Sequence, residues 1–183
     1  MTHDRLRDDE PRSLAESAAL DADASAGAPV NHPGARVLMV DAATGARGIV
    51  DHVQPDQWAS PTPCTEWSVR QIVEHLIAGN ERAATALVGP APPSATVAGD
   101  DLAAAFGASW DRLQWAYQAP GALTATVDMP FGPMPAAFMA QIRAGDMLVH
   151  AWDIARATGQ PTDYAPELNE TMLALSRRMF ATV

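Results

Sequence analysis

The sequence contains no lysine, so arginine supplies all 12 of its positive charges, against 22 aspartates and glutamates. The formal net charge is −10. Proteins that bind nucleic acid or an anionic membrane surface gain affinity from a basic face that meets phosphate groups. A chain this acidic is therefore expected to bind neither nucleic acid nor a membrane.

Cysteine and long apolar runs are also scarce. The single cysteine, Cys64, excludes a disulfide within the chain and fits a reducing compartment, so the cytoplasm is the expected location. The first residues mix charges of both signs and lack the apolar stretch of a secretory signal. The uncharged run over residues 83–99 contains three prolines and is shorter than the roughly 20 apolar residues of a membrane span. We therefore expect a soluble protein.

The length of 183 residues favours one domain. Residues 1–34 have no aromatic side chain and few large apolar ones, which would offset little of the entropy lost on ordering, so they are predicted to form a disordered N-terminal tail. Residues 35–183 are then the folded domain. Strand signals are scarce there, and the predicted class is all-α.

Apolar residues at helical spacing predict five helices, over residues 36–53, 68–89, 100–117, 135–159 and 166–180. The second has the clearest start, because Ser68 and Gln71 form a capping-box pattern. Residues 123–127 resemble a short strand, and the prolines of residues 130–135 predict a loop. Four main helices with one apolar stripe each are best buried as a four-helix bundle, with a short extra helix at the C-terminal end.

The fourth helix carries polar residues where a core is expected. At about 100° per residue, Asp146, His150 and Asp153 share one face. The apolar residues predicted to bury that face are Met139, Ile142, Val149 and Ala157. An unpaired carboxylate there would be costly. Either Asp146 and His150 pair with each other or with Arg143, or they bind a divalent metal ion as ligands one helical turn apart.

The second helix offers a third ligand. His75 lies at the edge of its apolar stripe, and Gly79, one turn further on, is expected to leave room for an ion. One histidine from this helix and the Asp146/His150 pair would supply three ligands and leave open positions for water or substrate. Spacing alone does not decide between this site and a buried polar network.

Two sequence blocks carry a family resemblance: residues 58–79, WASPTPCTEWSVRQIVEHLIAG, and residues 143–159, RAGDMLVHAWDIARATG. Together they resemble the DinB-like metal-binding superfamily, and within it the mycothiol-dependent maleylpyruvate isomerase N-terminal domain type. The resemblance covers about residues 36–180. It implies a DinB-like bundle in which His75, Asp146 and His150 hold a divalent ion, which is usually zinc in the family.

The resemblance also implies a chemistry. In the thiol-dependent relatives the ion holds a small thiol, such as mycothiol, as its thiolate. The thiolate adds to an activated double bond for cis–trans isomerisation, or displaces a leaving group in an S-transfer. The implied partners are a small-molecule thiol and an electrophilic substrate, and since relatives often dimerise, a homodimer is also considered. Asp153 would either orient the His150 imidazole or form a salt bridge with an arginine such as Arg82.

This sequence departs from the family pattern at two points, and these departures leave two functions to consider. The isomerase has a further C-terminal domain that contributes a catalytic arginine, for which this chain, ending at Val183, is expected to have no counterpart. Asp146 also stands where the isomerase has glutamate. We therefore expect either a metal- and thiol-dependent isomerase or transferase acting on another electrophile, or a non-catalytic metal-binding bundle for ligand binding or dimerisation.

Other reactive or aromatic residues have simpler interpretations. Cys64 precedes the second helix, where the helix dipole would favour a thiolate nucleophile or ligand, but a lone cysteine is more often a small core residue. His52 is expected at the surface. Four tryptophans are predicted to anchor the core, with Trp152 alternatively lining a pocket: Trp58, Trp67, Trp110 and Trp152.

Overall fold

The computed structural model describes residues 34–90, 101–130 and 132–180. Its elements in chain order are the helices α2 (Ala35–Val50), α3 (Val69–Val88) and α4 (Leu102–Gln118), the 3₁₀ turn η1 (Ala122–Thr124), the strands β1 (Thr126–Met129) and β2 (Gly132–Pro135), and the helices α5 (Ala136–Thr158) and α6 (Pro166–Phe180). The predicted tail over residues 1–34 lies outside the described residues, apart from its last residue.

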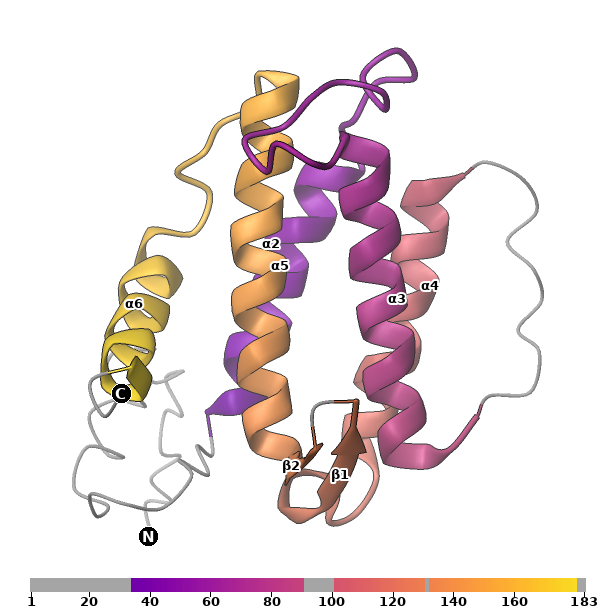
Figure 1. The fold of residues 1–183 in the computed structure, drawn as a ribbon, viewed down its shortest axis with the longest axis vertical. Coiled ribbons are helices and arrows are strands. Elements are labelled where there is room, and N and C mark those ends of the chain that lie inside the picture. The colour runs from indigo at the N-terminus through magenta and orange to yellow at the C-terminus, as the bar shows by residue number, and fades with distance from the viewer. Residues whose placement is uncertain (1–33, 91–100, 131, 181–183) are drawn as a thin grey trace, which may run out of the picture.

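The four long helices form a bundle (Figure 1). Helix α2 packs on α5 and α3 packs on α4, while α3 and α5 contact each other and join the two pairs. Helices α2 and α5 run in one direction, and α3 and α4 in the other. The segment between α2 and α3 crosses one end of the bundle, the β1–β2 hairpin lies at the other, and α6 flanks α5. The all-α bundle with an extra C-terminal helix is confirmed.

Small residues dominate the core where helices meet. On α2 and α5 the buried alanines include Ala42, Ala43, Ala46, Ala140, Ala144, Ala151 and Ala155. Larger side chains fill the space between the helices, among them Met39, Ile72, Leu76, Phe106, Leu113, Met147 and Ile154. Alanine stripes let helix backbones approach closely, which fixes the relative height of residues on neighbouring helices. No helix in the described parts of the chain combines the length and hydropathy of a membrane span.

The helix ends follow local sequence signals. At the start of α3 the Ser68 backbone N–H donates to Gln71 Oε1 over 2.9 Å, and the Gln71 N–H donates to Ser68 Oγ over 3.4 Å, which is the predicted capping box. The Asp101 carboxylate caps α4 by accepting from the Ala104 N–H over 3.0 Å. Helix α5 ends at Gly159, whose φ of 73° suits glycine.

Two boundary predictions were wrong. Helix α2 ends at Val50 instead of residue 53, because the chain turns at Asp51 and His52. The strand predicted over residues 123–127 begins only at Thr126, and the last four residues of the predicted loop form β2, which pairs antiparallel with β1. The prolines of β2 are tolerated because this sheet has two strands, both of which are edges.

The capping box gives a first test of the fold. Replacing Ser68 by alanine removes an acceptor for the α3 N-terminus, so Ser68→Ala is expected to lower the free energy of unfolding by about 0.5–2 kcal/mol. Ser68→Asp, which keeps a capping oxygen, is the matched control and should stay close to wild type. Urea denaturation measures both. Equal stability of the alanine and aspartate variants would contradict the role of the cap.

Candidate metal centre

Three side chains from two helices meet where α3 contacts α5. His75 comes from the second turn of α3, and Asp146 and His150 lie one turn apart on α5. Asp146 Oδ1 is 3.2 Å from His75 Nε2 and 3.5 Å from His150 Nε2. One potential ligand atom from each residue lies within 4.8 Å of the other two. The structure therefore brings together the three residues predicted as ligands.

The cluster lies at the border of the buried face of α5. The side chains of His75, Asp146 and His150 are 30%, 23% and 13% exposed. Ile142 and Val149, predicted to be buried around the cluster, are instead 37% and 59% exposed. The buried face of α5 is centred further round the helix, on residues such as Ala144, Met147 and Ala151. The clustered side chains are thus partly exposed instead of buried in mid-core.

Asp153 pairs with His150 and not with Arg82. Its carboxylate Oδ2 lies 3.0 Å from His150 Nδ1, and the residue is 5% exposed. A carboxylate at this distance favours a proton on Nδ1, which leaves the Nε2 lone pair directed toward the cluster. Of the two partners considered for Asp153, the structure shows the His150 imidazole.

Arg143 holds the other oxygen of Asp146. Its Nη1 forms an ion pair with Asp146 Oδ2, and its Nη2 donates to the Leu76 carbonyl over 3.1 Å and to Asn80 Oδ1 over 2.8 Å. The Arg143 side chain is only 7% exposed. Burial lowers the pKa of its guanidinium, and the neighbouring Asp146 carboxylate opposes that shift. A buried positive charge is therefore part of the cluster.

Gly79 makes space for this arginine. Its spacing after His75 had suggested space for an ion instead. A Cβ placed on Gly79 would lie 2.7 Å from Arg143 Cζ, closer than real side chains approach. The small residue on α3 thus lets the guanidinium lie directly against the α3 backbone. Sequence spacing identified the glycine but assigned its space to the wrong occupant.

Trp67 covers both imidazoles. Its ring centroid is 4.7 Å from that of His75 and 5.5 Å from that of His150. The loop before α3 sets this position, because Thr62 Oγ1 donates to the Trp67 carbonyl over 2.7 Å and the Trp67 N–H donates to the Cys64 carbonyl over 2.8 Å. Trp67 was predicted to be a core anchor, and its contact with the histidines was missed.

The remaining candidates do not join the cluster. Among the described residues the group that could hold a metal ion does not include Cys64, which is half-buried against the core. His52 is exposed, and its Nδ1 lies 2.7 Å from the Gly48 carbonyl oxygen, as expected for a surface residue. Trp110 is buried and Trp58 is half-buried.

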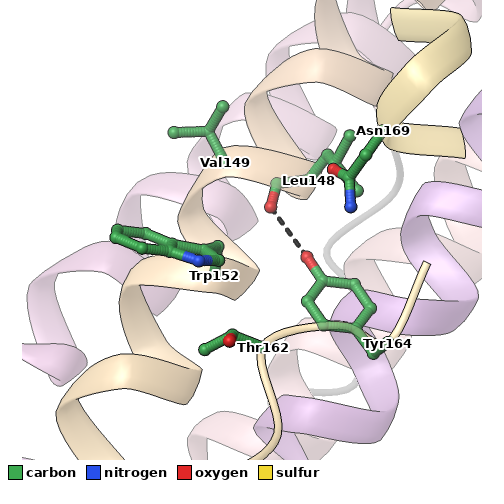
Figure 2. Close-up of a pocket in the computed structure, with 6 residues that line it drawn as sticks. All are labelled: Leu148, Val149, Trp152, Thr162, Tyr164 and Asn169. Carbon is green, nitrogen blue, oxygen red and sulfur yellow. Dashed lines mark hydrogen bonds between the residues drawn. The ribbon is translucent and has the colours of Figure 1, made fainter. Parts of the chain in front are cut away.

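Trp152 is not a core residue, because it is 42% exposed. It lines a pocket of about 180 Å³, which was the alternative for this residue, but the pocket is separate from the clustered residues. Figure 2 shows this pocket between α5, the segment after it and α6. Tyr164 closes one side by donating from its hydroxyl to the Leu148 carbonyl over 2.7 Å. None of the three clustered residues lines this pocket.

The donor set of the cluster suits a divalent ion. Two imidazole Nε2 atoms and one carboxylate oxygen are ligands that zinc, iron, nickel and manganese all accept. The second oxygen of Asp146 is occupied by Arg143, so the carboxylate offers one oxygen to an ion. Three protein ligands are fewer than any of these ions uses, and the remaining positions would accept an external ligand.

Comparison with known proteins identifies the family of the chain. The family model for the mycothiol maleylpyruvate isomerase N-terminal domain matches residues 39–155. An uncharacterized protein of Mycobacterium tuberculosis, recorded in strains CDC 1551/Oshkosh and ATCC 25618/H37Rv, is 38% identical over 135 residues, which are 72% of this chain and 71% of the relative.

The fold has a solved counterpart. The crystal structure of a histidine-to-alanine mutant of the mycothiol-dependent maleylpyruvate isomerase matches with a TM-score of 0.59 at 18% identity. The match covers 76% of this chain and 65% of that one. At this identity the likeness establishes the fold, and the family model establishes the relationship. The chain belongs to the mycothiol maleylpyruvate isomerase N-terminal domain family.

Proposed function

We propose that this protein is a metal-dependent enzyme that uses a small thiol, mycothiol in the first instance, as an isomerase or S-transferase on an electrophilic small molecule. The observation that carries the proposal is the convergence of His75 Nε2, His150 Nε2 and Asp146 Oδ1 within 4.8 Å of one another. These three residues are the proposed ligands of a divalent ion, with zinc as the first candidate.

The surroundings of the cluster support this assignment. The Asp153 carboxylate lies 3.0 Å from His150 Nδ1, which favours a proton on Nδ1 and leaves the Nε2 lone pair for an ion. Trp67 packs on both rings and restrains their rotation. A ligand set held in place before the ion arrives loses less entropy on binding, and Asp153 and Trp67 are the residues that would provide this order.

Formal charge favours an anionic ligand at the open position. A divalent ion with neutral imidazoles, Arg143 and the carboxylates of Asp146 and Asp153 leaves a net positive charge. When bound, the ion would lower the pKa of a coordinated thiol, so that the thiolate predominates at neutral pH. The buried guanidinium of Arg143 adds to the same field.

The reaction class follows from what a thiolate can do. Addition to an activated double bond, rotation and elimination isomerise the substrate and return the thiol, whereas displacement of a leaving group transfers sulfur to the substrate. The accessible side chains of His75 and Asp146 leave a route for both reactants. The proposal gives the class of the substrate, an electrophilic small molecule, and does not assign maleylpyruvate as that substrate.

A non-catalytic metal-binding bundle is the second candidate. It is favoured by one observation: the match spans 65% of the isomerase chain, so that part of the solved protein has no counterpart in the comparison. We further infer a cytoplasmic location, where thiols such as Cys64 and a small-thiol cofactor stay reduced. A homodimer stays a prediction, to be checked by analytical ultracentrifugation.

The ligand assignment predicts the metal content of the protein. Protein purified without a His tag should contain close to one divalent ion per chain by mass spectrometry, and His75→Ala, Asp146→Ala and His150→Ala should each lose most of it. His52→Ala is the matched control, because His52 is exposed and outside the cluster. A wild-type protein that stays empty after zinc titration would refute the metal site.

Asp153 should affect metal affinity without being a ligand. Asp153→Asn removes the charged acceptor of His150 Nδ1 and is expected to weaken zinc binding by about 10- to 100-fold in chelator competition. Asp163→Asn, at an exposed position in the segment after α5, is the control and should bind as wild type does. Unchanged affinity in Asp153→Asn would show that the pair is structural only.

A thiol should enter the open position of the cobalt-substituted protein. Added mycothiol, or a simpler thiol such as cysteine, is expected to produce a sulfur-to-cobalt charge-transfer band in the near ultraviolet. The band should be absent with the matching alcohol, serine. Stoichiometric cobalt without a thiol band would reject the enzyme and favour the non-catalytic candidate.

A further inference from the structure

We infer that Arg143 is a positioning residue, which fixes Asp146 with one oxygen on the guanidinium and the other facing His75 and His150, and that Gly79 exists to admit it. This inference rests on the proposed function, in which Asp146 is a metal ligand and its position affects metal binding. It goes beyond the three ligands by assigning roles to side chains on α3, α4 and α5 that contact no ion.

Arg143 binds only one of the two oxygens of the Asp146 carboxylate. Its Nη1 takes Asp146 Oδ2, while Oδ1 is left 3.2 Å from His75 Nε2 and 3.5 Å from His150 Nε2. A carboxylate at the end of an aspartate side chain otherwise rotates with little preference. The ion pair therefore selects the rotamer in which Oδ1 faces the histidines.

Arg143 is itself held by hydrogen bonds to α3. Its Nη2 donates to the Leu76 carbonyl and to Asn80 Oδ1, and its Nε has no hydrogen-bond partner among the described residues. All of its hydrogen bonds therefore come from the two terminal nitrogens, which point toward α3 and Asp146. The guanidinium is therefore fixed through Nη1 and Nη2, and Nη1 is the atom that binds the Asp146 carboxylate.

The hydrogen bonds that hold Arg143 continue to α4. Asn80 is fully buried, and its amide Nδ2 donates to Ser109 Oγ over 3.1 Å. Ser109 in turn donates to the Phe106 carbonyl over 2.8 Å. Because the amide nitrogen is committed to Ser109, the amide oxygen is presented to Arg143. A continuous set of hydrogen bonds thus runs from α4 through α3 to the carboxylate on α5.

Gly79 supplies the independent steric observation. A methyl group on this residue would lie 2.7 Å from Arg143 Cζ and 3.0 Å from Nη2. An alanine is otherwise favoured by about 1 kcal/mol over glycine inside a helix, so the glycine has a local disadvantage. Contact with the guanidinium explains why it is present one turn after His75.

The experiment separates the hydrogen bond of Arg143 from its charge. Arg143→Met and Arg143→Gln both remove the positive charge, but glutamine can still donate to an aspartate three residues along the helix. Cobalt affinity by chelator competition and the visible d–d spectrum are the readouts. Arg143→Met is expected to bind about 10- to 100-fold more weakly than wild type with an altered spectrum. Arg143→Gln should recover most of the affinity and the wild-type spectrum.

The matched control is Arg112→Met. Arg112 is likewise a largely buried arginine in an ion pair, with Glu81, and it also donates to a backbone carbonyl, that of Gly89. It is part of the α3–α4 contact and not of the metal cluster. Its loss should lower the melting temperature without changing cobalt affinity or spectrum. Thermal melts followed by circular dichroism establish that each variant is folded.

A second pair of variants keeps the inference testable if Arg143→Met does not fold. Gly79→Ala should weaken cobalt binding while Arg143 is present, because the methyl group displaces the guanidinium. In the double variant Gly79→Ala/Arg143→Gln the shorter side chain relieves the overlap, so affinity should exceed that of Gly79→Ala alone. Such a departure from additivity is expected for residues in contact.

The outcomes distinguish this inference from the proposed function. If wild type binds cobalt but the affinities of Arg143→Met and Arg143→Gln do not differ from each other, the hydrogen bond of residue 143 does not matter. Arg143 then acts only through its charge, and the positioning role is wrong. If both bind more tightly than wild type, repulsion between the guanidinium and the ion dominates, which also overturns it. If wild type binds no cobalt, the proposed function fails and this inference fails with it.

Discussion

The ion pair between Arg143 and Asp146 is the interaction on which the centre of this bundle depends. A buried guanidinium without a partner would destabilise the fold by several kcal/mol, so the carboxylate beside it cannot be removed without consequence. Arg143 starts on α5 and ends against the backbone of α3, the contact that joins the two helix pairs. The same carboxylate is therefore needed for the packing of the bundle and for the candidate metal centre.

This double use constrains the neighbouring residues. Because the guanidinium lies against α3, a Cβ on residue 79 would overlap it, and the Asn80 amide oxygen accepts from Arg143 Nη2. The Trp67 ring lies against His75 and His150, and Arg143 holds Asp146, so each of the three clustered side chains has a neighbour that restrains it.

The sequence was sufficient for the features that depend on local pattern. Periodicity and caps predicted the helices, and helical geometry placed Asp146, His150 and Asp153 on one face. The features that depend on how two helices meet were not predictable in this way. The occupant of the space beside Gly79 follows from the path of an arginine that is 64 residues away along the chain. The exposure of Val149 and the β1–β2 pairing likewise depend on neighbours that periodicity does not identify.

The division of the Asp146 carboxylate also has a chemical consequence. Since Oδ2 is neutralised by Arg143, less negative charge is available at Oδ1 to compensate an ion bound beside it. An ion that is less neutralised by its protein ligands attracts an anionic external ligand more strongly and acidifies it further. In the proposed function, the arginine that stabilises the bundle would therefore also favour thiolate over thiol at the open position of a bound ion, so that packing and reactivity would depend on one buried charge.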